Sequence, residues 1–191
     1  MTVLRKILMR TFGCPQGVLG RLGGIIMART NEGCGRWVAD LLEIRSDDNV
    51  LEIGFGPRVI IKHLSKRASV GHIAGVDLSG EMVKQARARN ATAIKTGRVD
   101  LRQDSAERLP FGDSTFDKAL AISSVQVWPE PVGALREIRR VMKTGARVAL
   151  GFIPYSGQPK EGLIEILSAA GFTKANVVER SDWFCAIALK E

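Results

Sequence analysis

Hydrophobic and polar residues alternate along most of this chain with two distinct periods. From residue 49 onward, short apolar runs typical of buried strands are separated by segments in which apolar residues recur every three or four positions, as on one face of a helix. The run over 116–123 is apolar on both faces, which is typical of a central strand in a parallel sheet. The pattern predicts strands over residues 49–54, 72–77, 99–104, 116–123, 144–152, 175–181 and 183–190.

Capping residues mark where two of the intervening helices begin. Ser79 is suited to the N-cap of a helix that carries Met82, Val83 and Ala86 on its apolar face. Pro131 is suited to the first turn of another helix, because its missing N–H would have no intrahelical partner there.

The order of these elements predicts the fold class. Strands that alternate with helices form a parallel sheet with helices on both faces. The last two strands lie too close in sequence for a crossover helix, so we expect them to pair antiparallel. We therefore predict an α/β three-layer sandwich of Rossmann-like type, with a seven-stranded, mostly parallel sheet and a C-terminal antiparallel hairpin.

Residues 1–45 differ from the rest and are predicted to form a separate helical segment before a domain over residues 46–191. Apolar residues between positions 3 and 12 recur at helical spacing among basic ones, which predicts a short basic amphipathic helix. The apolar residues of 37–42 predict a second helix. The first helix could pack on the domain, cover a substrate pocket as a lid, or touch a membrane surface through residues 1–12.

Composition limits the classes of function. The chain has 191 residues and a net charge of +8, which favours an anionic partner. Nucleic acid is nevertheless not expected, because only 6% of residues are aromatic and no basic–aromatic stripe is present for base stacking. Three scattered cysteines and two histidines predict no metal site and fit a reducing cytoplasm, and we expect neither a membrane span nor a secretion signal.

Candidate chemistry lies where the predicted strands end. Gly54 and Gly56 follow the first strand and let a backbone turn approach a ligand closely. Asp77 ends the next strand, 23 residues after Gly54, where a carboxylate can accept both hydroxyls of a ribose. This pair predicts a nucleoside cofactor. The nicotinamide dinucleotide fingerprint fails, because Val59 stands where its third glycine should be.

Four stretches together resemble the class I S-adenosylmethionine-dependent methyltransferases, in the subgroup of small-molecule and quinone-type enzymes. VLEIGFGP at 50–57 resembles the first motif of that family, and GVDLSGEMVKQARAR at 75–89 its second. QDSAERLPFGDSTFDKALAIS at 103–123 resembles the third and fourth, and TGARVAL at 144–150 resembles the following strand. The closing hairpin is also typical of the family.

The resemblance implies S-adenosylmethionine as cofactor and assigns residues to its site. The implied cofactor-binding residues are Glu52, Gly54, Phe55, Gly56, Asp77, Leu78, Met82, Asp104, Ser105, Ala106, Ile122 and Ser123. Asp77 would hold the ribose, Leu78 and Met82 would lie beside the adenine, and the end of the fourth strand would lie under the sulfonium. The family's adenine-reading acid aligns with Ser105, so either the Ser105 hydroxyl or the neighbouring Asp104 would take that role.

Two features depart from the family pattern. Arg58 stands at the position of the family's third glycine, and we expect its bulk to weaken cofactor binding more than its charge strengthens it. The stretch after the fifth strand lacks the usual substrate-covering insertion, so a lid would have to come from residues 1–45 or from a partner.

The predicted function is methyl transfer to a small-molecule acceptor. Gln126, Trp128 and Tyr155 are the candidate acceptor contacts, while no catalytic base is assigned. The alternatives are a non-catalytic nucleotide- or lipid-associated module that kept the fold, and a nucleic-acid methyltransferase. The acceptor atom and the oligomeric state are not specified by the sequence.

Overall fold

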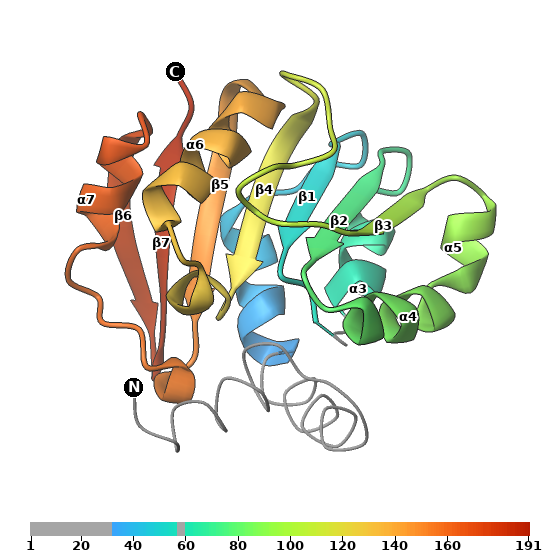
Figure 1. The fold of residues 1–191 in the computed structure, drawn as a ribbon, viewed down its shortest axis with the longest axis horizontal. Helices are drawn as coiled ribbons and strands as arrows, with labels where there is room; N and C mark the ends of the chain where they lie inside the picture. The colour runs from blue at the N-terminus through green and yellow to red at the C-terminus, as the bar shows by residue number, and fades with distance from the viewer. Residues whose placement is uncertain (1–31, 57–59) are drawn as a thin grey trace.

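The computed structural model describes residues 32–56 and 60–191, and its chain path is drawn in Figure 1. The predictions about residues 1–12, Cys14, Arg58 and Val59 lie outside these ranges. The helix predicted around residues 37–42 is present over residues 32–41.

The expected α/β architecture is confirmed. The first half contains β1 (Val50–Ile53), α3 (Ile60–Arg67), β2 (Ile73–Asp77), α4 (Gly80–Arg89), α5 (Ala91–Lys95) and β3 (Val99–Gln103). The second half contains β4 (Phe116–Ile122), the short 3₁₀ helix η2 (Val125–Val127), α6 (Pro131–Val141), β5 (Met142–Phe152), the 3₁₀ helix η3 (Pro154–Ser156), α7 (Leu163–Ala169), β6 (Thr173–Arg180) and β7 (Trp183–Leu189).

The seven strands form one sheet in the order β3-β2-β1-β4-β5-β7-β6. Strands β1 to β5 run parallel, whereas β7 pairs antiparallel with both β5 and β6. The closing hairpin is therefore present as predicted. The carboxyl ends of β1 to β5 lie at one edge of the sheet, which is the lower edge at β4 in Figure 1.

Helices cover both faces of the sheet and give three layers (Figure 1). On one face, Leu135 and Ile138 of α6 and Leu163 of α7 are buried against the strands. On the other, α3, α4 and the helix over residues 32–41 are buried against the strands. Residues 32–42 thus share a core with the sheet, and the proposed division at residue 45 remains a prediction.

The long loop from β3 to β4 is fastened to α6 by Glu137 and Arg140, which form an ion pair within α6, and Arg140 also pairs with Asp113 of the loop. Arg140 donates from Nη2 to Glu137 Oε1 at 2.7 Å and from Nε to Oε2 at 2.8 Å, and the same Oε1 accepts the N–H of Leu109 at 2.9 Å. Arg140 also donates to the carbonyl of Phe111 at 3.0 Å. The pair therefore holds the LPF segment of the loop across the end of α6.

Two local features differ from the sequence prediction. Strand β5 begins at Met142 instead of Thr144, because Met142 pairs with Phe116 before a bulge in the ladder. The short helix α5 was not predicted, since none of its five residues is buried and it carries no apolar stripe. The predicted N-cap is present, with the Met82 N–H donating to Ser79 Oγ at 3.4 Å.

No helix of the described residues is both long enough and apolar enough to cross a membrane. Cys34 and Cys185 are buried in the core, and burial raises the pKa of the Cys185 thiol. These two cysteines therefore behave as the inert apolar residues that their sparse distribution predicts.

The Glu137–Arg140 pair gives a pH-dependent prediction. The hydrogen bonds from Arg140 lower the pKa of Glu137, so its stabilising contribution is complete above the ordinary carboxyl pKa and is lost as pH falls through the lowered value. We expect Glu137→Gln to cost about 1 kcal/mol near pH 7, or about 2–4 °C in the unfolding midpoint, because a neutral amide cannot accept both guanidinium bonds.

Thermal unfolding of both proteins from pH 7 down to pH 3 tests this. The difference between wild type and Glu137→Gln should shrink as the pH is lowered. A difference that stays constant over that range would mean that the charge of Glu137 is not what fastens the loop.

Candidate functional site

The order of the strands brings the predicted site residues to one edge of the sheet. β3, β2, β1 and β4 are neighbours and run parallel, so the loops at their carboxyl ends lie side by side. The predicted residues occupy these ends in the order 104–106, 77–78, 54–56 and 122–123. This edge is where ligands bind in open α/β sheets.

The carboxylate of Asp77 joins two of these loops. Its Oδ2 accepts the backbone N–H of Gly56 at 2.7 Å, and its Oδ1 accepts the N–H of Ser79 at 2.8 Å. Its carbonyl also accepts the N–H of Asp104 at 3.2 Å. A single residue thus connects the loops that follow β1, β2 and β3, and a carboxylate can accept up to about four hydrogen bonds in all.

Gly54 makes the turn after β1 in a conformation that other residues adopt with difficulty. Its φ is +70°, and a Cβ at this position would lie 2.6 Å from the Cβ of Ser124. The hydroxyl of Ser124 donates to the carbonyl of Ile53 at 3.0 Å, which links the ends of β1 and β4. The close approach of these two loops therefore requires glycine at position 54.

The residues expected beside the adenine differ in exposure. The side chain of Leu78 is 63% exposed at the end of β2, an unusual position for a large apolar group, and it is available to cover a ligand. Met82 lies in the first full turn of α4 and is only 2% exposed. Any contact of Met82 with the adenine therefore has to be made from the buried side of the loop between β2 and α4.

The loop after β3 carries both candidates for the adenine-reading residue, Asp104 and Ser105. Oδ1 of Asp104 accepts the N–H of Ser105 at 2.9 Å, and Oγ of Ser105 accepts the N–H of Glu107 at 3.2 Å. Ala106 packs against the core beside them.

Three predicted site residues have fully buried side chains. The Phe55 ring is fully buried, because it fills the space over Gly75, whose Cβ would lie 2.7 Å from Phe55 Cδ1. Ile122 and Glu52 are also fully buried. The part that these three residues play in cofactor binding stays a prediction.

The segment after β4 carries two polar atoms that need a partner. Ser123 has a φ of +47°, and its N–H still donates to the carbonyl of Gly151 at 2.8 Å. The Nε2 of Gln126 donates to the carbonyl of Ser123 at 2.8 Å. Within the described residues, Ser123 Oγ and Gln126 Oε1 are buried and have no hydrogen-bond partner.

The other acceptor candidates follow β4 and β5. Trp128 directly follows η2 and is partly buried against the core. Tyr155 lies in η3, directly after β5. Gln126, Trp128 and Tyr155 thus come from the loops after the two central strands.

Neither histidine joins this edge. His63 accepts the Nε–H of Arg67 at 3.0 Å, and burial together with the charges of Arg67 and Arg36 lowers its pKa. His72 precedes β2, at the opposite end of the strands, where its N–H donates to Asn49 Oδ1. The His63 ring has a structural partner and His72 lies at the other end of the strands, so both are poor candidates for a base at this site.

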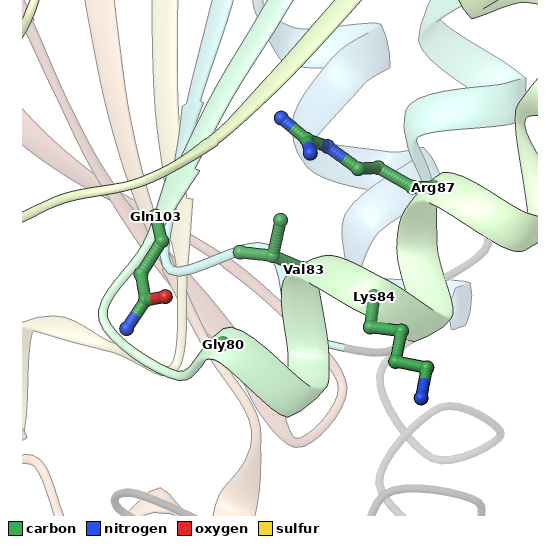
Figure 2. Close-up of a pocket in the computed structure, with 5 residues that line it drawn as sticks. All are labelled: Gly80, Val83, Lys84, Arg87 and Gln103. Carbon is green, nitrogen blue, oxygen red and sulfur yellow. The ribbon is translucent and has the colours of Figure 1, made fainter.

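A hollow adjoins the predicted site between α4 and the end of β3. Figure 2 shows the residues that line it, which are Gly80, Val83, Lys84, Arg87 and Gln103. The guanidinium of Arg87 donates to the carbonyl of Leu101 at 2.9 and 2.6 Å, and the amide of Gln103 donates to the carbonyl of Leu78 at 3.2 Å. These polar groups fasten the edge strand, and none of the five was expected to bind the cofactor.

Comparison with known proteins identifies the family. The model of the methyltransferase domain matches residues 51–150, and the chain belongs to this family. The uncharacterized methyltransferase YdaC of Bacillus subtilis is 32% identical over 133 residues, which cover 70% of this chain and 71% of YdaC. The demethylmenaquinone methyltransferase of Lactiplantibacillus plantarum is 30% identical over 155 residues, covering 81% of this chain and 64% of that enzyme.

Solved structures agree on the fold. A S-adenosylmethionine-dependent methyltransferase from Aquifex aeolicus superposes with a TM-score of 0.74 at 22% identity, over 82% of this chain and 89% of that one. The chain thus belongs to a methyltransferase family and has the fold of this S-adenosylmethionine-dependent enzyme. The residues present fit S-adenosylmethionine as a cofactor, because an acidic side chain, two positive-φ glycines and an exposed leucine converge at the edge expected to hold it.

Gly54 gives a prediction with an internal control. Gly97 has nearly the same φ, +72°, but nothing lies within 4 Å of its Cβ position. We expect Gly97→Ala to cost about 1–2 kcal/mol of stability through backbone strain alone. Gly54→Ala should cost a further ~1–3 kcal/mol because its Cβ meets Ser124, and it should weaken cofactor binding.

Thermal unfolding and calorimetric titration with S-adenosylmethionine measure both effects. Equal losses of stability in the two variants, with unchanged cofactor affinity, would show that the contact between the β1 and β4 loops does not matter for the site.

Proposed function

We propose that this protein transfers the methyl group of S-adenosylmethionine to a small-molecule acceptor at the carboxyl ends of β1 to β4. The observation that carries the proposal is the position of the Asp77 carboxylate, which spans the loops after β1 and β2, next to the point between β1 and β4 where the order of the strands changes direction. The similarity to a demethylmenaquinone methyltransferase supports a small acceptor.

The cofactor would occupy the half of the edge formed by β1, β2 and β3. Asp77 would accept the ribose hydroxyls, and Leu78 would cover the adenine. Gly54 and Gly56, with φ of +70° and +54°, would let the backbone approach the methionine part. When bound, S-adenosylmethionine supplies an electrophilic methyl group on a positively charged sulfur.

The acceptor would occupy the half formed by the loops after β4 and β5. Gln126, Trp128 and Tyr155 follow these strands and would line its pocket. A transfer of this kind depends mainly on holding the acceptor in line with the methyl group and on excluding water. Residues 1–45 remain the proposed cover of this pocket.

The role of Asp77 is tested by Asp77→Ala. Loss of two charge-assisted hydrogen bonds should weaken S-adenosylmethionine binding about 10–150-fold, equivalent to ~1.5–3 kcal/mol. Asp100→Ala is the matched control, because Asp100 lies on the neighbouring strand β3, where it pairs with Arg102.

Calorimetric titration of the wild type and both variants measures the affinities, and thermal unfolding verifies that each is folded. Near-equal affinities of wild type and folded Asp77→Ala would remove Asp77 from the cofactor site and with it the basis of the proposal.

A further inference from the structure

The turn after β4 holds a serine in an unfavourable backbone conformation. Ser123 has a φ of +47°, in the left-handed region that L-residues other than glycine, asparagine and aspartate rarely adopt. Its neighbours impose this conformation, since its own N–H is bonded to Gly151 and the Ser124 hydroxyl to Ile53. Strain of this kind gathers at functional sites, where the structure around it keeps a side chain in a required position.

The same turn fixes the orientation of the Gln126 amide. A backbone carbonyl only accepts hydrogen bonds, so the amide atom that lies 2.8 Å from the carbonyl of Ser123 has to be the NH₂ group. The oxygen Oε1 therefore points the other way. It is buried and, among the residues that the structure describes, has no hydrogen-bond partner.

Ser123 Oγ, on the first residue after β4, is buried and unpartnered in the same way. Native proteins seldom keep buried polar atoms without partners, because each loses its bonds to water and gains nothing in exchange. Two such atoms on one strained turn, at the carboxyl end of the central strand, mark a place where a ligand group completes the bonding.

The chemistry of the two atoms restricts what that group can be. Gln126 Oε1 can only accept a hydrogen bond, and Ser123 Oγ can accept one as well. Neither an amide oxygen nor a serine hydroxyl takes up a proton at ordinary pH. The turn is therefore suited to a group that offers two hydrogen-bond donors and can react without transferring a proton to these residues.

We infer that Ser123 and Gln126 position a neutral amine as the methyl acceptor, so that this enzyme methylates nitrogen. The inference rests on the proposed function. Two N–H groups bonded to Ser123 Oγ and Gln126 Oε1 leave the nitrogen lone pair directed away from the turn and available for attack. The nitrogen forms a bond to the methyl carbon, the bond from that carbon to sulfur breaks with its electron pair remaining on sulfur, and a proton leaves the alkylated nitrogen for water.

A hydroxyl acceptor suits the turn less well. Alkylation of a neutral hydroxyl requires a base to remove its proton during the transfer, and an ionised hydroxyl offers no donor to Gln126 Oε1. An amine loses its proton after the transfer, from the ammonium product, and needs no base. Ser123 and Gln126 are thus positioning residues in this scheme.

The first experiment needs no acceptor. Ser123→Gly relieves the positive φ and removes the unpartnered hydroxyl, so the unfolding midpoint of the full chain should rise by about 2–4 °C. Ser114→Gly is the matched control, because exposed Ser114 has a similar φ of +50° but precedes β4 at the opposite end of the strand. Ser114→Gly should stabilise the protein without affecting methyl transfer. A fall in the unfolding midpoint of Ser123→Gly would overturn the inference.

The second experiment uses acceptors matched in shape. Aniline is compared with phenol, and benzylamine with benzyl alcohol, by following S-adenosylhomocysteine formation at saturating S-adenosylmethionine. We expect the amine of at least one pair to be methylated about 10-fold faster or more than its hydroxyl partner. Gln126→Leu should lower kcat/KM for that amine about 10-fold and reduce the preference, while Ser123→Gly should lower it about 3–10-fold.

Several outcomes would contradict the inference. A preference for the hydroxyl compounds, or no turnover of any amine, would reject nitrogen as the acceptor. A loss of S-adenosylmethionine affinity by more than about threefold in Gln126→Leu would mean that the two atoms hold the amino group of the cofactor instead. Methylation of the hydroxyl compounds in preference to the amines, by an enzyme that binds S-adenosylmethionine, would leave the proposed function intact while rejecting this inference.

Discussion

The arrangement of the candidate site depends on the two hydrogen bonds that the Asp77 carboxylate accepts. One comes from Gly56 in the loop after β1 and the other from Ser79 at the start of α4, at 2.7 and 2.8 Å. The second places the Ser79 side chain where it caps α4, and the first sets how far the β1 loop extends toward β2. A neutral side chain at position 77 could not hold two backbone donors in the same way, so the separation of the loops is set by one charge.

Small contacts carry this constraint across the sheet. Because Gly54 has no Cβ, Ser124 can contact the end of β1. Ser124 lies in the same segment as Ser123, whose backbone is strained, and Gln126, whose amide is bonded to the Ser123 carbonyl. The proposed cofactor and acceptor halves are therefore connected through the β1–β4 contact. This connection accounts for why a serine with a positive φ can persist next to a central strand.

The sequence predicted the fold well because its signals are local. Apolar runs, the Ser79 cap and the closing hairpin each depend on a few neighbouring residues, and all three are present in the structure. Details that depend on distant contacts were not predicted from the sequence. The Phe55 ring turns inward because Gly75 on the next strand leaves room for it, and β5 starts early because Met142 meets Phe116. The sequence does not predict the strain at Ser123, since serine does not favour a positive φ.

The central claim is that the ends of β1, β2 and β3 hold the cofactor with Asp77 at the ribose. A crystal structure of the full chain with S-adenosylhomocysteine tests it most directly. The account predicts both ribose hydroxyls within hydrogen-bond distance of the Asp77 carboxylate, with the adenine against Leu78. A ribose placed elsewhere, for example in the hollow between α4 and β3 lined by Lys84 and Gln103, would contradict it.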